Sequence, residues 1–118
     1  MFIEQLKRVV ENTEGGVGAL VMGLDGIAVE TFVRPGSEVD INTIGMEFSF
    51  ILTQVKKAAE ILKVGQLDEI SIKAEQLILV IRMLSDDYFV AVTMSADGNF
   101  GKCRFLLRLV APQLIAQL

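Results

Sequence analysis

The sequence contains no histidine among its 118 residues. Without an imidazole, a Ser-His or Cys-His nucleophile, a histidine-ligated zinc site and the most frequent general base near neutral pH are all excluded. Cysteine occurs once, at Cys103, so no disulfide can form within the chain, and we expect a reducing, cytoplasmic compartment. Eleven basic residues face fifteen acidic ones, and this net charge of −4 argues against binding to nucleic acid.

Long hydrophobic runs are also missing. The longest uninterrupted aliphatic block, residues 77–81, is far shorter than the ~20 residues of a membrane span, and no basic leader precedes an apolar stretch. We therefore expect neither membrane insertion nor a signal peptide. With 52% apolar and 22% charged residues, the chain has the composition of a globular protein, and its length predicts a single domain over residues 1–118.

Hydrophobic periodicity divides the chain into helices and strands. Three stretches carry apolar residues at helical spacing, and they predict helices over residues 2–13, 41–64 and 100–118. In the last of these, Pro112 should bend or terminate the helix because its ring clashes with a carbonyl one turn back. Five stretches are apolar on one or both faces, and they predict strands over residues 16–23, 27–33, 67–74, 77–83 and 88–94.

The resulting element order is α-β-β-α-β-β-β-α. The Asp25-Gly26 pair and the short turns between the last three strands indicate hairpins at both ends of the chain, and hence a mostly antiparallel five-stranded sheet. Several strands are apolar on both faces, so helices should cover both sides of the sheet. The sequence therefore predicts an α/β (α+β) fold with a three-layer α/β/α architecture.

Local motifs that resemble chemical sites all lack an essential feature. The segment from Gly15 to Gly18 has a helix before it and a strand after it, the reverse of a dinucleotide-binding loop. Residues 98–102 open a helix but lack the spacing and the Ser or Thr of a phosphate loop, so a capped turn is the simpler interpretation. The pairs Asp68-Glu69 and Asp86-Asp87 do not converge on a substrate, and Cys103 without a histidine is best interpreted as a structural thiol. We therefore expect no catalytic, cofactor-binding or metal-binding residue, and no enzyme activity.

The helix predicted over 41–64 is apolar on two opposite faces. One stripe should pack on the sheet, and it consists of Ile41, Ile44, Phe48, Ile51, Leu52, Val55, Ala59 and Leu62. The opposite face follows the spacing i, i+4, i+7, i+11, i+15, i+18 and consists of Met46, Phe50, Thr53, Lys57, Ile61 and Val64. Either another helix of the same chain covers this second face or a second copy does. The second copy is favoured because the two remaining helices are needed on the other side of the sheet.

The strand predicted over 67–74 supports the same interpretation. Its residues alternate, with Ile70 and Ile72 on one face and polar residues on the other. If this strand lies at a sheet edge, pairing across a two-fold axis would satisfy its free backbone groups. Helix and strand together predict one homodimer interface, formed by Met46, Phe50, Thr53, Lys57, Ile61, Val64, Glu69, Ser71 and Lys73.

These segments resemble the Roadblock family, which includes dynein light chains of the Roadblock type and MglB-type regulators of Ras-like GTPases. The resemblance rests on the hairpin from Gly18 to Ile27, the long central helix and the Asn99-Phe100-Gly101 helix entry, and it covers essentially the whole chain. It implies a profilin-like Roadblock domain whose third strands join two copies into a ten-stranded sheet, with the long helices paired above it.

The resemblance also implies a function. It predicts a homodimeric regulator or scaffold that binds a Ras-like small GTPase and modulates its GTP hydrolysis or localisation, without an arginine finger. The long helix indeed contains no arginine, and the candidates for GTPase contact are Phe50, Gln54, Lys57 and Glu60. Two alternatives remain open: a structural adaptor of a motility, polarity or motor complex with no effect on GTP turnover, and a ligand-binding sensory module with a pocket between sheet and helix.

Overall fold

The structure of the protein is a computed structural model that describes residues 1–118. It contains all the predicted helices and strands in the predicted order, and their ends differ only slightly from expectation. The elements are α1 (Phe2–Asn12), β1 (Gly16–Gly23), β2 (Ala28–Val33), α2 (Ile41–Leu62), β3 (Glu69–Lys73), β4 (Ile78–Met83), β5 (Tyr88–Met94) and α3 (Phe100–Ala116). None of the helices combines the length and apolar character that crossing a membrane requires.

The five strands form one sheet in the order β2-β1-β5-β4-β3, and every neighbouring pair is antiparallel. The predicted Asp25-Gly26 hairpin is present, because Gly23 donates its amide to the carbonyl of Ile27 at 3.0 Å and Gly26 has a φ of 84°. The strands β1 and β5, which are apolar on both faces, lie in the centre and are almost wholly buried. The alternating strand β3 lies at one edge, as the predicted interface requires.

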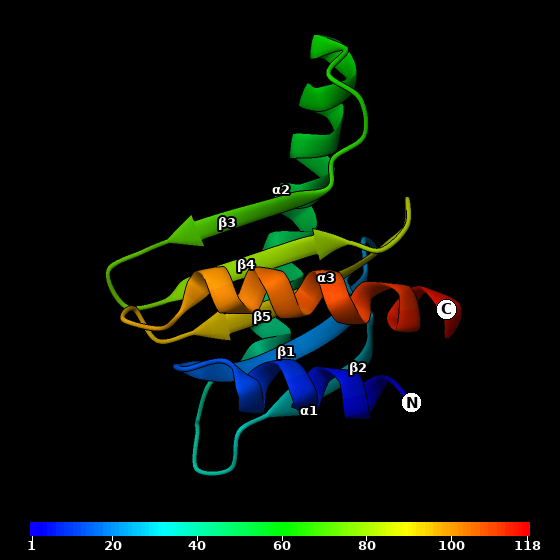
Figure 1. Ribbon diagram of the computed structural model, residues 1–118. Coiled ribbons are helices and arrows are strands. Elements are labelled where there is room, and N and C mark those ends of the chain that lie inside the picture. Colours follow the sequence, from blue (N-terminus) through cyan, green and yellow to red (C-terminus); the bar gives the residue numbers. More distant parts are fainter.

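Helices cover both faces of the sheet, which confirms the predicted three layers (Figure 1). On one face, α1 and α3 lie side by side and bury a core that includes Leu6, Val92 and Leu107. On the other face, α2 alone packs over a smaller core around Leu52 and Phe89. Because α1 and α3 both lie on the far side of the sheet, no helix of this chain covers the outer face of α2.

The inner face of α2 differs from the predicted stripe. Its buried residues include Gly45 and Ser49, whereas Ile51 is 39% exposed and Leu62 is 69% exposed. Gly45 lies so close to β1 that a Cβ there would come within 2.8 Å of the Met22 side chain, so the smallest residues of the helix face the sheet. The last turns of α2 extend beyond the edge strand β3, and therefore no sheet lies below them (Figure 1).

The ends of the helices follow from capping and packing. Asp40 caps α2 by accepting hydrogen bonds from the hydroxyl and the amide of Thr43, at 2.7 and 3.1 Å, and these bonds hold the pKa of Asp40 below its ordinary value. Of the two effects expected of Pro112, a bend or termination, termination does not occur, since α3 continues through it to Ala116. Leu114, beyond the proline, is fully buried, and this packing offsets the missing backbone hydrogen bond.

Candidate protein-interaction site

The outer face of α2 is an uncovered apolar surface. Met46, Phe50, Ile61 and Val64, four of the predicted interface residues, are 56%, 68%, 80% and 72% exposed. Met46, Phe50 and Ile61 lie on one side of α2 because their successive spacings of 4 and 11 residues are close to whole helical turns. Val64, which was predicted to lie on the same helix, instead follows the end of α2 at Leu62 and the left-handed Lys63. Exposed apolar groups gathered on one element of a chain are typical of an interaction surface.

The two polar members of this predicted face behave differently from each other. Thr53 is only partly exposed, and its hydroxyl donates to the carbonyl of Ser49 at 3.1 Å, so it points back along the helix. Lys57 is exposed and forms no ion pair within the chain. The structure therefore places Lys57 on the free surface and Thr53 at its border.

The end of α2 adds apolar surface that periodicity had assigned to the core. We call the last turns of α2, which extend past β3 and end at Leu62, the overhang (Figure 1). Leu62, the last residue of α2, is 69% exposed there. The overhang projects past the free edge of β3, and we call this arrangement, which is open on one side, the step (Figure 1).

The edge strand β3 presents free backbone groups on its outer side. Asp68 accepts a hydrogen bond from the amide of Met83, and Ala74 donates to the carbonyl of Leu77, both at 2.8 Å. In an antiparallel pair, only every second residue of an edge strand forms backbone hydrogen bonds with the neighbouring strand. The N–H and C=O groups of the three predicted interface residues of β3 therefore point away from β4, and these residues are Glu69, Ser71 and Lys73.

Glu69 is the only ionisable residue of β3 that is held by charges of its own chain. Its carboxylate accepts hydrogen bonds from the guanidinium of Arg104 on α3, with Nε to Oε2 at 2.7 Å, and lies 3.5 Å from Nη1 of Arg82 on β4. The guanidinium of Arg104 also lies over the ring of Phe100, 5.7 Å from its centroid. These contacts tie the edge strand to the helix on the other side of the sheet, whereas Lys73 has no such partner.

The four predicted GTPase-contact residues do not share one surface. Phe50, Gln54 and Lys57 follow one another at i, i+4 and i+7 and lie on the outer face of α2. Glu60 instead lines a groove on the side of the helix. The outer face is thus a mixed apolar and polar surface, with Glu60 at its margin.

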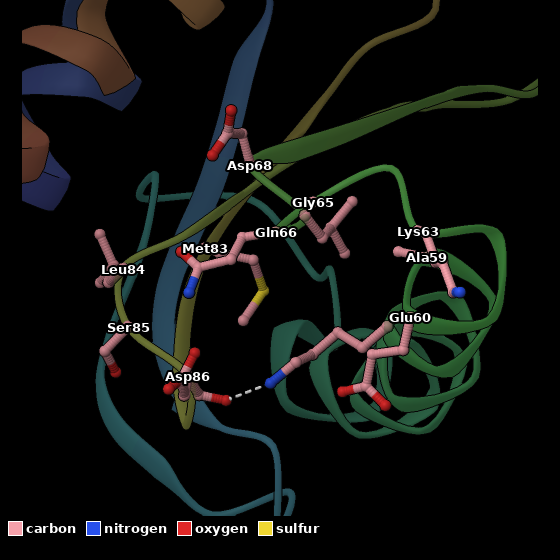
Figure 2. A pocket seen from close by; sticks show the side chains of 12 residues that line it. Ala59, Glu60, Lys63, Gly65, Gln66, Asp68, Met83, Leu84, Ser85 and Asp86 are labelled. Atoms are coloured by element: carbon pink, nitrogen blue, oxygen red, sulfur yellow. Dashed lines mark hydrogen bonds between the residues drawn. The ribbon is translucent and has the colours of Figure 1, made fainter.

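The groove is a feature that the sequence did not reveal. It has a volume of about 1130 Å³ and lies between the second half of α2, the segment 63–68 and the turn joining β4 to β5 (Figure 2). The Nζ atom of Lys56 donates to the backbone carbonyl of Asp86 at 2.6 Å and so links the helix to this turn (dashed line in Figure 2). The lining carries charges of both signs, because it includes Lys56, Glu60, Lys63, Asp68 and Asp86.

Cys103 lies outside these surfaces. Its side chain is fully buried on the inner face of α3, and burial raises the pKa of its thiol to about 12. A thiol in this state is protonated at neutral pH and is a poor nucleophile. The expectation of a structural thiol agrees with this environment.

Comparisons with known proteins identify the family. The chain is 44% identical to MglC from Myxococcus xanthus over 99% of this chain and 98% of that one, with a TM-score of 0.73. The fold is also similar to that of the gliding protein MglB from Thermus thermophilus, at 14% identity, 97% and 85% coverage and a TM-score of 0.86. A Roadblock/LC7 domain from Streptomyces avermitilis gives 12% identity, 95% and 96% coverage and a TM-score of 0.76. No protein-family model and no curated protein sequence matches the chain.

An antiparallel five-stranded sheet with two helices on one face and one long helix on the other defines a Roadblock, profilin-like fold. The chain belongs to the Roadblock family and resembles MglB and MglC within it.

Proposed function

We propose that the protein is a homodimeric regulator or scaffold that binds a Ras-like small GTPase and modulates its GTP hydrolysis or localisation, without a catalytic residue of its own. The observation that carries this proposal is the outer face of α2, which is apolar, exposed and uncovered by any helix of the same chain. The partner class comes from the resemblance of the sequence to MglB-type regulators of Ras-like GTPases, and the 44% identity with MglC supports membership of that family. We further propose that residues 1–118 act as one domain in the cytoplasm, where the single thiol stays reduced.

The proposed homodimer uses the step formed by the overhang and the edge of β3. A second copy that pairs its own β3 across a two-fold axis would bring its sheet below the overhang and its α2 beside this one. Complete burial of an aliphatic or Phe side chain is worth roughly 1.5–3 kcal/mol, and a two-fold interface buries each one twice. For the four exposed residues this sum exceeds the lower estimates of the cost of association, ~4 kcal/mol. The proposed interface comprises Met46, Phe50, Thr53, Lys57, Ile61, Val64, Glu69, Ser71 and Lys73.

The proposed GTPase contact overlaps the proposed dimer interface at Phe50 and Lys57 and extends from it to Gln54 and Glu60. Phe50 supplies an apolar anchor at the border between the two copies, while Gln54, Lys57 and Glu60 supply polar contacts around it. A GTPase that bridges both copies would meet these residues from each paired helix. None of them is an arginine, so any effect on hydrolysis would arise from positioning the GTPase's own residues.

GTP hydrolysis by a purified Ras-like GTPase, measured with and without this protein, tests the proposal. We expect the saturating dimer to bind the GTPase and to change its rate of GTP hydrolysis. Lys57→Glu, compared at concentrations at which sedimentation shows that the variant is still dimeric, should weaken binding about tenfold, as for a residue at the centre of a contact. The control variant Lys102→Glu makes the same charge change on α3, on the other side of the sheet, and should bind normally. Failure of the wild-type dimer to bind any Ras-like GTPase in either nucleotide state would refute the proposal.

Two other outcomes correspond to the alternative functions. If the GTPase binds but its turnover is unchanged at saturating dimer, the protein is a scaffold or a structural adaptor. A ligand-binding sensory module would instead use the groove between α2 and the β4–β5 turn, which is large enough for a small molecule and carries both acidic and basic groups. That function requires a small polar ligand whose binding is lost in Lys56→Ala, while the GTPase contact is unaffected.

A further inference from the structure

The strand β3 carries opposite charges at its two ends. Glu69 and Lys73 are the first and last residues of the strand, Ile70 and Ile72 lie next to them, and Ser71 is the central residue. Antiparallel pairing of two identical strands places residues opposite each other whose numbers add to a constant. If the two-fold axis passes through Ser71, Glu69 of each copy lies opposite Lys73 of the other, and Ile70 lies opposite Ile72.

We propose that this arrangement of charges is a self-recognition code. In the dimer of the proposed function, on which this inference rests, two copies of this chain pair their β3 strands about an axis through Ser71. Two cross-strand pairs between Glu69 and Lys73 select both the register and the identity of the partner. A different Roadblock chain that lacks a Glu and a Lys at these two positions pairs less well with this edge.

The backbone is arranged for this register. The outward N–H and C=O groups belong to Glu69, Ser71 and Lys73, because the residues between them bond to β4. An axis through Ser71 sets these three residues of one copy against the same three of the other, so every free group on both strands finds a partner. It also keeps Ile70 and Ile72 of both copies on the face that carries α2.

Neighbouring registers are less favourable because of their charges. An axis through Ile70 sets Glu69 against Ser71 and leaves Lys73 without an acidic partner. An axis through Ile72 brings Glu69 toward Glu75 of the other copy. Axes through Glu69 or Lys73 set like charges directly against each other, which is destabilising in cross-strand pairs. Only the axis through Ser71 joins opposite charges without opposing like ones.

The side chains are prepared for the pairing to different degrees. The carboxylate of Glu69 is held at the edge by Arg82 and Arg104, with its side chain 21% exposed, and it keeps acceptor sites for a further donor. Lys73 is exposed and has no ion pair in its own chain, so its charge is free for the second copy. The two arginines already neutralise part of the charge of Glu69, and we therefore expect a moderate contribution from each pair.

Reversing the charge of Lys73 tests the code. In Lys73→Glu, two carboxylates oppose each other at both ends of the paired strands, and we expect the dissociation constant of the dimer to rise about 10- to 100-fold in sedimentation experiments. The matched control is Lys7→Glu, which makes the same change at an exposed position of α1 and should leave the constant unchanged. Equal dissociation constants for the two variants would overturn the proposal that these charges select the partner.

Cysteine trapping tests the register directly. Residues that face each other in a hydrogen-bonded antiparallel pair have Cα atoms about 5.5 Å apart, within the range that a disulfide spans. Under oxidation, Ser71→Cys should therefore form a covalent dimer rapidly on a non-reducing gel. Ile70→Cys and Ile72→Cys should each remain monomeric on that gel but should link to each other when mixed. The native Cys103 is buried and should not form a disulfide between copies, so the wild-type protein serves as the negative control.

The outcomes separate this inference from the proposed dimer. If the wild-type protein sediments as a monomer, the dimer of the proposed function is wrong, and the proposed strand register is wrong as well. If the wild type is a dimer but Ile70→Cys or Ile72→Cys links to itself faster than Ser71→Cys, the dimer stands and the register is wrong. Rapid linkage of Ser71→Cys together with a weakened Lys73→Glu dimer supports both.

Discussion

Two residues of α2, Phe50 and Leu52, lie close together in sequence but should respond to substitution in opposite ways. Phe50 is 68% exposed on the outer face, whereas Leu52 is fully buried in the smaller core. Phe50→Asp should leave the stability of the single chain nearly unchanged, within about 0.5 kcal/mol, because exposed side chains contribute little to it. Leu52→Ala should lower the free energy of unfolding by roughly 2–5 kcal/mol, the cost of a cavity in a packed core.

The dimer should show the reverse dependence. Scaling the roughly 1.5–3 kcal/mol of a fully buried Phe by its exposed fraction of 68%, and counting both copies, gives about 2–4 kcal/mol of association free energy. This corresponds to an increase of roughly 30- to 700-fold in the dissociation constant of the dimer. This estimate takes all of the exposed Phe50 surface as covered in the dimer, and the introduced carboxylate adds a desolvation cost in the same direction.

Sedimentation velocity over a range of concentrations measures the association, and urea unfolding below the dimer dissociation constant measures the fold. We expect Phe50→Asp to be monomeric with an unfolding midpoint close to that of wild type, and Leu52→Ala to show a lower midpoint. A Phe50→Asp protein that dimerises as tightly as wild type would refute the assignment of the outer face to the interface. A drop in its unfolding midpoint as large as that of Leu52→Ala would show that the outer face is covered within the chain.

Three further predictions concern the fold. Asn99 caps α3 by accepting from the amide of Lys102 at 3.1 Å, and Asn99→Ala should cost about 1 kcal/mol of unfolding free energy in urea titrations, while Asn99→Asp should cost less. Arg34 donates to the carbonyls of Gly16 and Val10, both at 2.8 Å, so Arg34→Met should lower the unfolding free energy by roughly 1–3 kcal/mol, and Arg34→Lys should recover only part because an ammonium lacks the planar fork. Cys103 should resist alkylation at pH 8 until urea unfolds the chain. Because its pKa is about 12 when folded and 9 when unfolded, stability should fall as pH rises through that interval, and Cys103→Ala should flatten this dependence; an equally steep loss in the variant would rule out the thiol as its cause.

Much of the fold could be predicted from hydrophobic periodicity. The strand β1 is apolar on both faces, and it lies in the centre of the sheet; β3 alternates, and it lies at the edge. The inner face of α2 was predicted less well, because periodicity places the largest apolar residues inward. Close packing of the helix on β1 instead requires small residues at the contact, and Gly45 and Ser49 take these positions. Ile51 and Leu62, which periodicity assigns to the inner face, are exposed.

The candidate site was predictable where it depends on one element. Phe50 and Lys57 share a face of α2 because they are separated by seven residues, and any helix of that length would place them so. The ion pairs of Glu69 were not predictable, since Arg104 lies 35 residues away in sequence and on the other side of the sheet's edge. The same holds for the groove, whose walls come from three separate segments.

Local patterns thus decide the eight elements, their amphipathic faces and the arrangement of charges on β3, because each depends on neighbours along the chain and on the two backbone periods. Only the assembled sheet decides that β3 is an edge, that α1 and α3 leave the outer face of α2 bare, and that the last turns of α2 extend over empty space. Those features depend on which strands pair and how closely a helix approaches them. These distances are set by packing between residues far apart in sequence, which periodicity does not record.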